Sequence, residues 1–288
     1  MKLTWSVSQT YHQWLVRDYL IHVRAFSNRL LKEIKKEGEI LVNGEAVTVR
    51  AKLYTADQLT IHFPIERRSE RVVPVYMPLK VVYEDDYILV VNKPRGIAVS
   101  PNMNDLSGVT LANGVLDYFD RQALQSTFHV VTRLDRYTSG LVLIAKHRYI
   151  HHLLQGSEVK REYEAFVSGQ LKCQSGTIDL PIARNLPSII ERKVSENGKR
   201  AVTHYRVNKK TAQGSLVEVR LETGRTHQIR VHFAHLGHPL LGDDLYGGDR
   251  SLLSGQALHC QWLTFNHPLT KKVVKTYATK PVELVGLI

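Results

Sequence analysis

Short apolar stretches of strand length dominate the sequence beyond about residue 80, and they limit the possible folds more than any other feature. Two segments in this part, residues 111–119 and 226–236, have helical patterns, but they do not alternate regularly with the strands. A doubly wound parallel sheet needs such alternation, so the pattern favours a mixed α+β domain built on a mainly antiparallel sheet. The predicted strands are residues 88–91, 141–145, 163–167 and 216–221.

The first 66 residues predict a small module of their own. Ser27 can cap a helix that Gly38 would end, and Asn43-Gly44 suits a type I′ hairpin turn, because both central residues of that turn need positive φ. The apolar stripe of this helix consists of Leu30, Leu31 and Ile34. Residues 67–79 contain three arginines among prolines and are interpreted as a basic linker. The expected organisation is therefore a module over 1–66, a linker over 67–79 and a larger domain over 80–288.

The balance of charge points to a polyanionic partner. Among 288 residues, 39 lysines and arginines stand against 27 aspartates and glutamates, a formal net charge of +12, which suits nucleic acid or an anionic lipid surface. No uninterrupted apolar run approaches the roughly 18–20 residues that span a bilayer, so membrane insertion is not expected. The N-terminal residues lack the apolar core of a signal peptide, and the two cysteines, Cys173 and Cys260, show no metal-type spacing. We therefore expect a cytoplasmic protein with reduced thiols.

The predicted N-terminal helix lies in a basic stretch. Between Arg17 and Lys52, eight basic residues stand against five acidic ones. Phosphate contacts with RNA would account for this excess, and so would an ordinary solvated helix face; composition alone leaves both open. The candidate RNA-binding residues in this stretch are Arg29, Lys32 and Lys36.

A polar, turn-prone segment at residues 133–140 runs directly into the apolar strand at 141–145, which places Asp135 on a loop at a strand edge. Arg133 and Arg136 flank this aspartate, and nearby cations favour the ionised form of a carboxyl group. An ionised, positioned carboxylate is one of the few protein nucleophiles able to attack an anomeric carbon. The alternative is an aspartate that caps a turn beside two surface arginines, and the segment alone does not decide between them.

A second candidate site lies at residues 222–230. A strand ends there, Gly224 permits a tight turn and a helix begins, so Arg225 lies where a strand edge meets a helix N-terminus. Exposed backbone N–H groups and the positive end of the helix dipole favour an anion at such a junction, and a guanidinium adds a bidentate fork. A structural arginine paired with a neighbouring acid is the alternative.

Tyr163 and a group of histidines complete the candidates. Alternation along the strand at 163–167 turns Tyr163 towards the core, where packing alone would explain it. The histidines lie on and after the second predicted helix, but no acidic residue or cysteine stands at ligand spacing from them, so no metal site is predicted. They are His227, His232, His235 and His238.

Six ordered motifs, taken together, resemble the RluA family of pseudouridine synthases. They extend from about residue 80 to about residue 280, so the resemblance covers most of the larger predicted domain. The motifs are Val91-Asn92-Lys93-Pro94 with Gly96, RLDRYTSG at 133–140, REYEAFVSG at 161–169, TGRTHQIRVH at 223–232, GHPLLGDDLYG at 237–247 and LHCQWLTFNHP at 258–268. The N-terminal helix and its Val42-Asn43-Gly44 hairpin resemble an S4-type RNA-binding module.

The resemblance implies the pseudouridine synthase fold and an isomerase that acts on uridine in ribosomal or transfer RNA, with no metal and no organic cofactor. In that family the base is detached from its ribose, turned and rejoined through carbon. Asp135 falls on the nucleophilic aspartate, Arg225 on the arginine that pairs with it, and Tyr163 on the active-site tyrosine, which could stack against the extruded base and help to remove its C5 proton. Arg133 would fill the gap that the flipped nucleotide leaves, and Arg136 is a further RNA-binding candidate. The expected partner is RNA and not a membrane, and the enzyme is expected to be a monomer.

Thr132 and Ser100 stand where histidine is frequent in the family, which bears on substrate contacts more than on the reaction. An RNA-binding assembly factor without catalysis is one alternative function, but the joint presence of the three candidate catalytic residues argues against it. A glycosidase that uses Asp135 is another, but it would need a second carboxylate about 5–10 Å away, and none is evident in the sequence.

Overall fold

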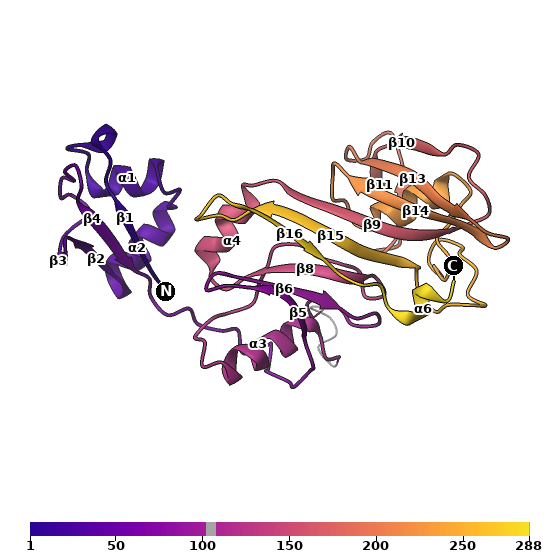
Figure 1. The fold of residues 1–288 in the computed structure, drawn as a ribbon, viewed down its shortest axis with the longest axis horizontal. Coiled ribbons are helices and arrows are strands. Elements are labelled where there is room, and N and C mark those ends of the chain that lie inside the picture. The colour runs from indigo at the N-terminus through magenta and orange to yellow at the C-terminus, as the bar shows by residue number, and fades with distance from the viewer. Residues whose placement is uncertain (102–107, 288) are drawn as a thin grey trace.

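The computed structural model describes residues 1–101 and 108–287 and shows a small body at one end of a longer one (Figure 1). The strands of the small body are β1 (Lys2–Ser6), β2 (Glu39–Val42), β3 (Glu45–Ala46) and β4 (Gln58–His62). Its helices are the 3-10 helix η1 (Gln9–Tyr11), α1 (Val16–His22) and α2 (Asn28–Glu37). The strands form an antiparallel sheet in the order β1-β4-β2-β3, and α1 and α2 pack their apolar faces into the same core.

Local sequence signals set the boundaries of α2 and of the hairpin that follows it. The Ser27 hydroxyl accepts a hydrogen bond from the Leu30 backbone N–H at 3.1 Å, and the helix ends at Gly38. Asn43 and Gly44 have φ values of 52° and 87°, the left-handed values that a type I′ turn requires. The predicted helix and hairpin are therefore confirmed.

The longer body is built on one large sheet. Its strands are β5 (Lys80–Glu84), β6 (Ile88–Lys93), β7 (His129–Val130), β8 (Ser139–Ala145), β9 (Val159–Ser168), β10 (Ser175–Asp179), β13 (Val202–Lys210), β14 (Gly214–Leu221), β15 (Leu258–Asn266) and β16 (Val273–Tyr277). Eight of them follow the order β10-β13-β14-β9-β15-β8-β6-β5, with β16 added to β15 and β7 to β8. Among the described strands only β8 and β15 pair in parallel, so the predicted α+β class and mainly antiparallel sheet are confirmed. A separate hairpin consists of β11 (Ile182–Arg184) and β12 (Arg192–Val194).

Few helices accompany this sheet. They are α3 (Leu111–Arg121), α4 (Arg148–Gln155), α5 (Gln228–His235) and α6 (Val282–Val285). The helix predicted at 226–236 begins later, at Gln228, because His227 has a φ of 57° and so lies outside the right-handed helical region. In the part of the chain that the structure describes, no helix combines the length and the apolar character needed to cross a membrane.

The small body rests on α4 of the longer one (Figure 1). The centre of the Tyr149 ring lies 4.7 Å from that of Phe26 and 5.3 Å from that of Phe63. Beside these rings, Glu33 of α2 forms an ion pair with Arg148 of α4. The two bodies therefore share one apolar core, and removal of the small body would expose α4 to water.

Residues 67–79 join the two bodies and contain no helix or strand. Arg68 of this segment is nevertheless anchored, because its Nε donates to the Ser126 carbonyl oxygen at 2.8 Å and its Nη1 pairs with Asp120. At least one arginine of the predicted basic linker is thus engaged with the protein itself.

Candidate active site

Three neighbouring strands bring the predicted catalytic residues to one place. Asp135 lies in the loop between β7 and β8, just before β8 begins. Gly140 of β8 stands opposite Cys260 of β15, and Cys260 stands opposite Tyr163 of β9. The end of the Asp135 loop and Tyr163 therefore lie on either side of β15.

A glycine allows this close approach of β8 and β15. Gly140 has a φ of 111°, which other residues rarely adopt, and a Cβ at this position would lie 2.2 Å from the Cys260 carbonyl oxygen. Any side chain would push the two strands apart. Because Gly140 has no side chain, the end of the Asp135 loop lies directly against β15, the strand that pairs with Tyr163 of β9.

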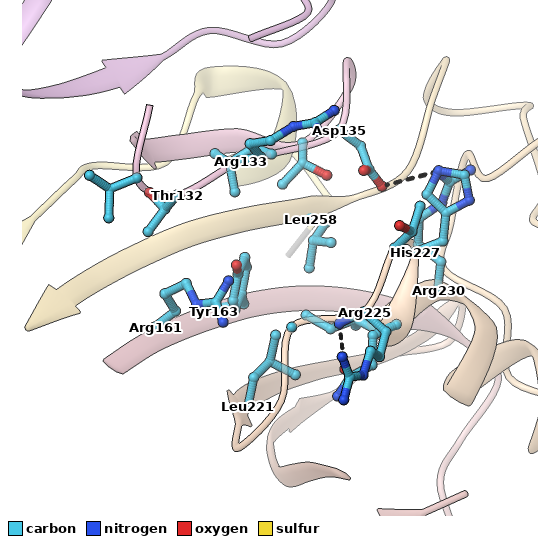
Figure 2. A pocket seen from close by; sticks show the side chains of 17 residues that line it. Thr132, Arg133, Asp135, Arg161, Tyr163, Leu221, Arg225, His227, Arg230 and Leu258 are labelled. Atoms are coloured by element: carbon cyan, nitrogen blue, oxygen red, sulfur yellow. Dashed lines mark hydrogen bonds and ion pairs between the residues drawn. The ribbon is translucent and has the colours of Figure 1, made fainter. Parts of the chain in front are cut away.

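A cavity of about 360 Å³ opens beside this junction, and its walls include Asp135, Tyr163, Arg225 and Arg133. Figure 2 shows Asp135 and Tyr163 on different sides of the space, with Leu258 between them. The volume lies near the lower end of the roughly 300–1,000 Å³ that is typical of small-ligand pockets, so the cavity can admit one nucleotide base but no folded RNA. The four residues that the sequence grouped as a candidate site thus surround one space.

The cation that pairs with Asp135 is Arg230, and not Arg225 as predicted. Nη1 of Arg230 donates to Oδ2 of Asp135 at 3.2 Å, and Nε2 of His227 lies 3.8 Å from the same oxygen (Figure 2). Both groups come from the segment where α5 begins. The carboxylate therefore faces the first turn of that helix.

Arg225 is turned elsewhere because of the way the loop before α5 is held. The buried Gln228 side chain accepts hydrogen bonds from the Thr223 hydroxyl and the Arg225 backbone N–H, both at 2.9 Å. Nε of Arg225 donates to the Arg200 carbonyl oxygen at 3.0 Å. Since α5 begins only at Gln228, Arg225 stays on the loop at the cavity wall, whereas Arg230 lies within the helix and reaches Asp135.

Arg230 is itself held by a buried carboxylate. Its Nε and Nη2 each lie 2.7 Å from an oxygen of Asp243, whose side chain is fully buried, and this leaves Nη1 for Asp135. Burial acts to lower the pKa of Arg230, but the two carboxylates outweigh it and raise the pKa above its usual value. A permanently charged guanidinium is thus fixed with one N–H directed at Asp135.

Tyr163 is almost fully buried where β9 passes the cavity. Burial raises the pKa of its hydroxyl well above the usual value, and the neighbouring Cys260 adds to the effect. The hydroxyl is therefore protonated at neutral pH and can donate a hydrogen bond. Core packing and a place in the cavity wall, which the sequence posed as alternatives, are both features of this side chain.

Comparison with known proteins decides the family. The family model described as RNA pseudouridylate synthase matches residues 87–235, a span that contains Asp135, Tyr163 and Arg230. The chain belongs to this family. It is an RNA pseudouridine synthase, an isomerase that acts on RNA.

Individual relatives of the synthase cover most of its length. It is 45% identical over 267 residues to the uncharacterized RNA pseudouridine synthase YjbO of Bacillus subtilis (strain 168), with 91% of this chain and 94% of that protein covered. It is 39% identical over 281 residues to ribosomal large subunit pseudouridine synthase D of Vibrio cholerae, with 91% and 86% covered. The solved structure of human RNA pseudouridylate synthase domain containing 1 matches with a TM-score of 0.58 and 26% identity, over 71% of this chain and 84% of that one. The predicted family and fold are confirmed.

The arginines that flank Asp135 in the sequence of the synthase differ in their surroundings. Nε of Arg136 donates to the Gly96 carbonyl oxygen at 2.8 Å and ties the loop to the segment after β6. Arg133 is exposed at the cavity wall, and within the described residues neither arginine forms an ion pair with Asp135. The ion pair of Asp135 is therefore supplied by Arg230 and not by its neighbours in the sequence.

A buried lysine, for which no catalytic or structural role was predicted, supports the same loop. Lys93 ends β6 without exposed surface, and its Nζ donates to the carbonyl oxygens of Pro94, Ile97 and Arg136 at 2.8–3.1 Å. Burial lowers its pKa to about 7, against the opposing effect of Asp135. The available signal was a lysine at the end of an otherwise apolar strand, since such a lysine needs buried acceptors.

Two of the histidines on and after α5, His232 and His238, are hydrogen-bonded within the protein. The ring nitrogens of His232 lie 2.9 Å from the Thr203 hydroxyl and the Leu180 carbonyl oxygen, and Nδ1 of His238 lies 2.8 Å from the Ser168 carbonyl oxygen. These imidazoles hold α5 and the following loop against neighbouring strands. Within the described residues, no group of three or more His, Cys, Asp or Glu side chains could hold a metal ion.

A basic groove of about 610 Å³ lies on the small body. Its basic lining residues are Arg17, Lys32, Lys35 and Arg50. Of the three RNA-binding candidates on α2, Lys32 lies in this groove. Arg29 pairs instead with Glu33 at 3.2 Å, and Lys36 pairs with Glu37 at 3.0 Å. The helix thus has one face of basic side chains turned to the groove and another where cations are paired with acids.

Proposed function

We propose that the synthase uses Asp135 as a nucleophile on C1′ of a flipped uridine. The supporting observation is the ion pair between Asp135 and the buried Arg230, at the wall of a cavity that also contains Tyr163. Attack by the carboxylate forms an ester bond to C1′ and breaks the bond between C1′ and N1 of the base. The uracil then turns, C5 bonds to C1′ as the ester bond breaks, and the C5 proton passes to solvent while N1 takes up a proton, which completes the isomerisation.

Base flipping follows from the depth of this site. The Asp135 side chain is 31% exposed and Tyr163 is nearly buried, so a base stacked within RNA could not reach both. We assign Tyr163 to stacking and to hydrogen bonding with the extruded uracil, because a protonated hydroxyl with a raised pKa is a poor base for the C5 proton. The exposed Arg133 at the cavity wall is placed to occupy the gap left in the RNA.

We propose ribosomal RNA as the substrate, because relatives that share 36–39% identity with the chain carry the name ribosomal large subunit pseudouridine synthase D. The test is to map pseudouridines after incubation of the enzyme with ribosomal and transfer RNA from cells that lack it. New pseudouridine is expected at one or a few ribosomal positions. Modification confined to transfer RNA would overturn the substrate assignment but not the enzyme class.

We also propose that the small body, as an S4-like module over residues 1–66, holds the RNA through its basic groove. Lys32→Gln combined with Lys35→Gln should lower the slope of log affinity against log salt by about 1.5, since each lost phosphate contact removes roughly 0.7–0.9 from it. Turnover at saturating RNA should be unchanged, because Asp135 and Tyr163 lie in the other body. The measurements are RNA affinity at several salt concentrations and single-turnover rates.

The matched control is Arg29→Gln combined with Lys36→Gln. It removes the same charge from the same helix, but at side chains that pair with Glu33 and Glu37. Its salt slope should stay near that of the unmodified enzyme. Equal slopes for both double variants would mean that the groove is not the RNA-binding face. Point variants are preferable to deletion of the module, because deletion would uncover Tyr149.

We further propose that the enzyme is a cytoplasmic monomer organised as the module over 1–66, the linker over 67–79 and a catalytic domain over 80–288. The strands of residues 1–66 form a sheet of their own, which supports this division. The two cysteines form no disulfide with each other, which agrees with a reducing compartment.

A further inference from the structure

The walls of the cavity hold more positive charge than the proposed chemistry uses. Four arginines and one carboxylate, Asp135, are among the residues that line it. Arg230 is neutralised by two carboxylates, Nε of Arg225 is bonded to a backbone carbonyl, and Arg133 is exposed to solvent. The fourth arginine, Arg161, has no such explanation.

Arg161 precedes Tyr163 by two positions on β9, so the two side chains lie on the same face of the strand (Figure 2). Its Nε is buried and has no hydrogen-bond partner within the described residues. No Asp or Glu oxygen of the described chain lies within 4.0 Å of its guanidinium. In the free enzyme, therefore, neither a carboxylate nor a hydrogen bond to Nε offsets the cost of partly burying this charged guanidinium.

Gly224 provides the surface against which this guanidinium lies. A Cβ added at Gly224 would be 2.7 Å from Nη2 and 3.1 Å from Nη1 of Arg161. The loop before α5 therefore leaves room for the planar group at the cavity wall. The guanidinium therefore lies against this loop, with no acceptor for its Nε within the described residues.

We propose that Arg161 binds a backbone phosphate of the flipped nucleotide and so holds the uridine over Asp135. The inference rests on the proposed entry of a uridine into this cavity. Uracil is neutral, whereas the phosphates on either side of its ribose are anionic, and a planar guanidinium binds phosphate through two parallel hydrogen bonds. The surplus of arginine over carboxylate in the cavity wall matches an anionic ligand and not a neutral one.

The neighbouring strand offers a matched control. Arg220 of β14 stands opposite Glu162, which points to the other face of the sheet from Arg161, and pairs with Glu162 at 3.5 Å. Arg161→Gln and Arg220→Gln therefore remove the same group from adjoining strands on opposite faces.

The first experiment compares single-turnover kinetics of these two variants on the mapped substrate RNA. For Arg161→Gln, the RNA concentration that gives half-maximal rate should rise about 10- to 100-fold, the effect of losing a charge-assisted hydrogen bond, while the maximal rate changes less than about threefold. Arg161→Lys should have a half-saturation concentration between those of Arg161→Gln and the unmodified enzyme, because the ammonium keeps the charge but not the two parallel N–H donors. Arg220→Gln should have the same half-saturation concentration as the unmodified enzyme. A normal half-saturation concentration for Arg161→Gln, or a fall confined to the maximal rate, would overturn the proposal.

The second experiment identifies the acceptor. RNA with a neutral methylphosphonate immediately 5′ or 3′ of the target uridine should bind the unmodified enzyme more weakly at one of these two linkages. That substitution should cause no further loss in Arg161→Gln, since the interaction is already absent. Independent losses at both linkages would show that Arg161 contacts neither phosphate.

Gly224→Ala displaces the guanidinium but keeps its charge, and the clash falls on the flexible end of a side chain, so the fold should persist. The variant should raise the half-saturation concentration, and combination with Arg161→Gln should add little. If the proposed role of Asp135 as the nucleophile is wrong, Asp135→Asn will retain activity, whatever the result for Arg161. An error in the Arg161 inference alone would leave Asp135→Asn inactive and Arg161→Gln normal.

Discussion

Asp135→Asn should reduce pseudouridine formation by about 10⁴-fold or more while the fold and the RNA affinity stay largely intact. The amide has nearly the shape of the carboxylate and still offers an oxygen to Arg230, but it cannot act as the nucleophile. Arg230 keeps its bidentate contact with Asp243, so no buried charge is left alone. The measurements are pseudouridine yield in single turnover, thermal unfolding and RNA binding.

The control for this variant is Asp244→Asn. Asp244 is exposed and follows Asp243, so the substitution makes the same chemical change close to the site without touching it. Its activity should equal that of the unmodified enzyme. Activity of Asp135→Asn within tenfold of that level would exclude the carboxylate as nucleophile.

The features that depend on neighbouring residues were predictable from the sequence. Ser27 and Gly38 delimit α2, and Asn43-Gly44 makes the hairpin turn, because caps and turns are set by backbone and side-chain geometry within a few residues. Alternation along β9 was enough to turn Tyr163 inward. Motif order then grouped Asp135 with Tyr163, and both side chains line the same cavity.

The partner of Asp135 was not predictable. Arg225 and Arg230 both belong to the motif at residues 223–232, and the residue at which α5 begins determines which of them reaches Asp135. A helix beginning at Thr226 would carry its residues in a different orientation from one that begins at Gln228 after the left-handed His227. A shift of two residues turns the side chains by about 200° around the axis. Which guanidinium faces the cavity thus depends on a backbone conformation that residue types do not reveal.

Contacts between distant segments also escaped prediction. Asp243 holds Arg230 from the loop after α5, and Lys93 supports a loop that begins some 40 residues later. Each case requires knowledge of how separate elements pack.

Arg230→Met should have the largest combined effect on stability and activity in this enzyme. It leaves the fully buried Asp243 without a cation, and breaking a buried pair on one side lowers the free energy of unfolding by about 3–5 kcal/mol. It also removes the guanidinium from Asp135, so turnover should fall even at temperatures where the variant is folded. Denaturant unfolding and single-turnover rates measure the two effects.

Arg225→Met is the comparison that tests the corrected assignment. Arg225 is exposed, and its Nε bonds only to the Arg200 carbonyl oxygen among the described residues, so the unfolding free energy should change by less than about 1 kcal/mol. Turnover should be lower in Arg230→Met than in Arg225→Met. The opposite order would show that Arg225 is the functional partner of Asp135.

The double variant Arg230→Met with Asp243→Asn separates the structural contribution of Arg230 from its effect on Asp135. Neutralising position 243 removes the uncompensated buried charge, so most of the lost stability should return. Asp135 still lacks its partner, so turnover should remain as low as in Arg230→Met. Recovery of turnover together with stability would show that Arg230 serves only to neutralise Asp243, and that the N–H directed at Asp135 contributes nothing to the reaction.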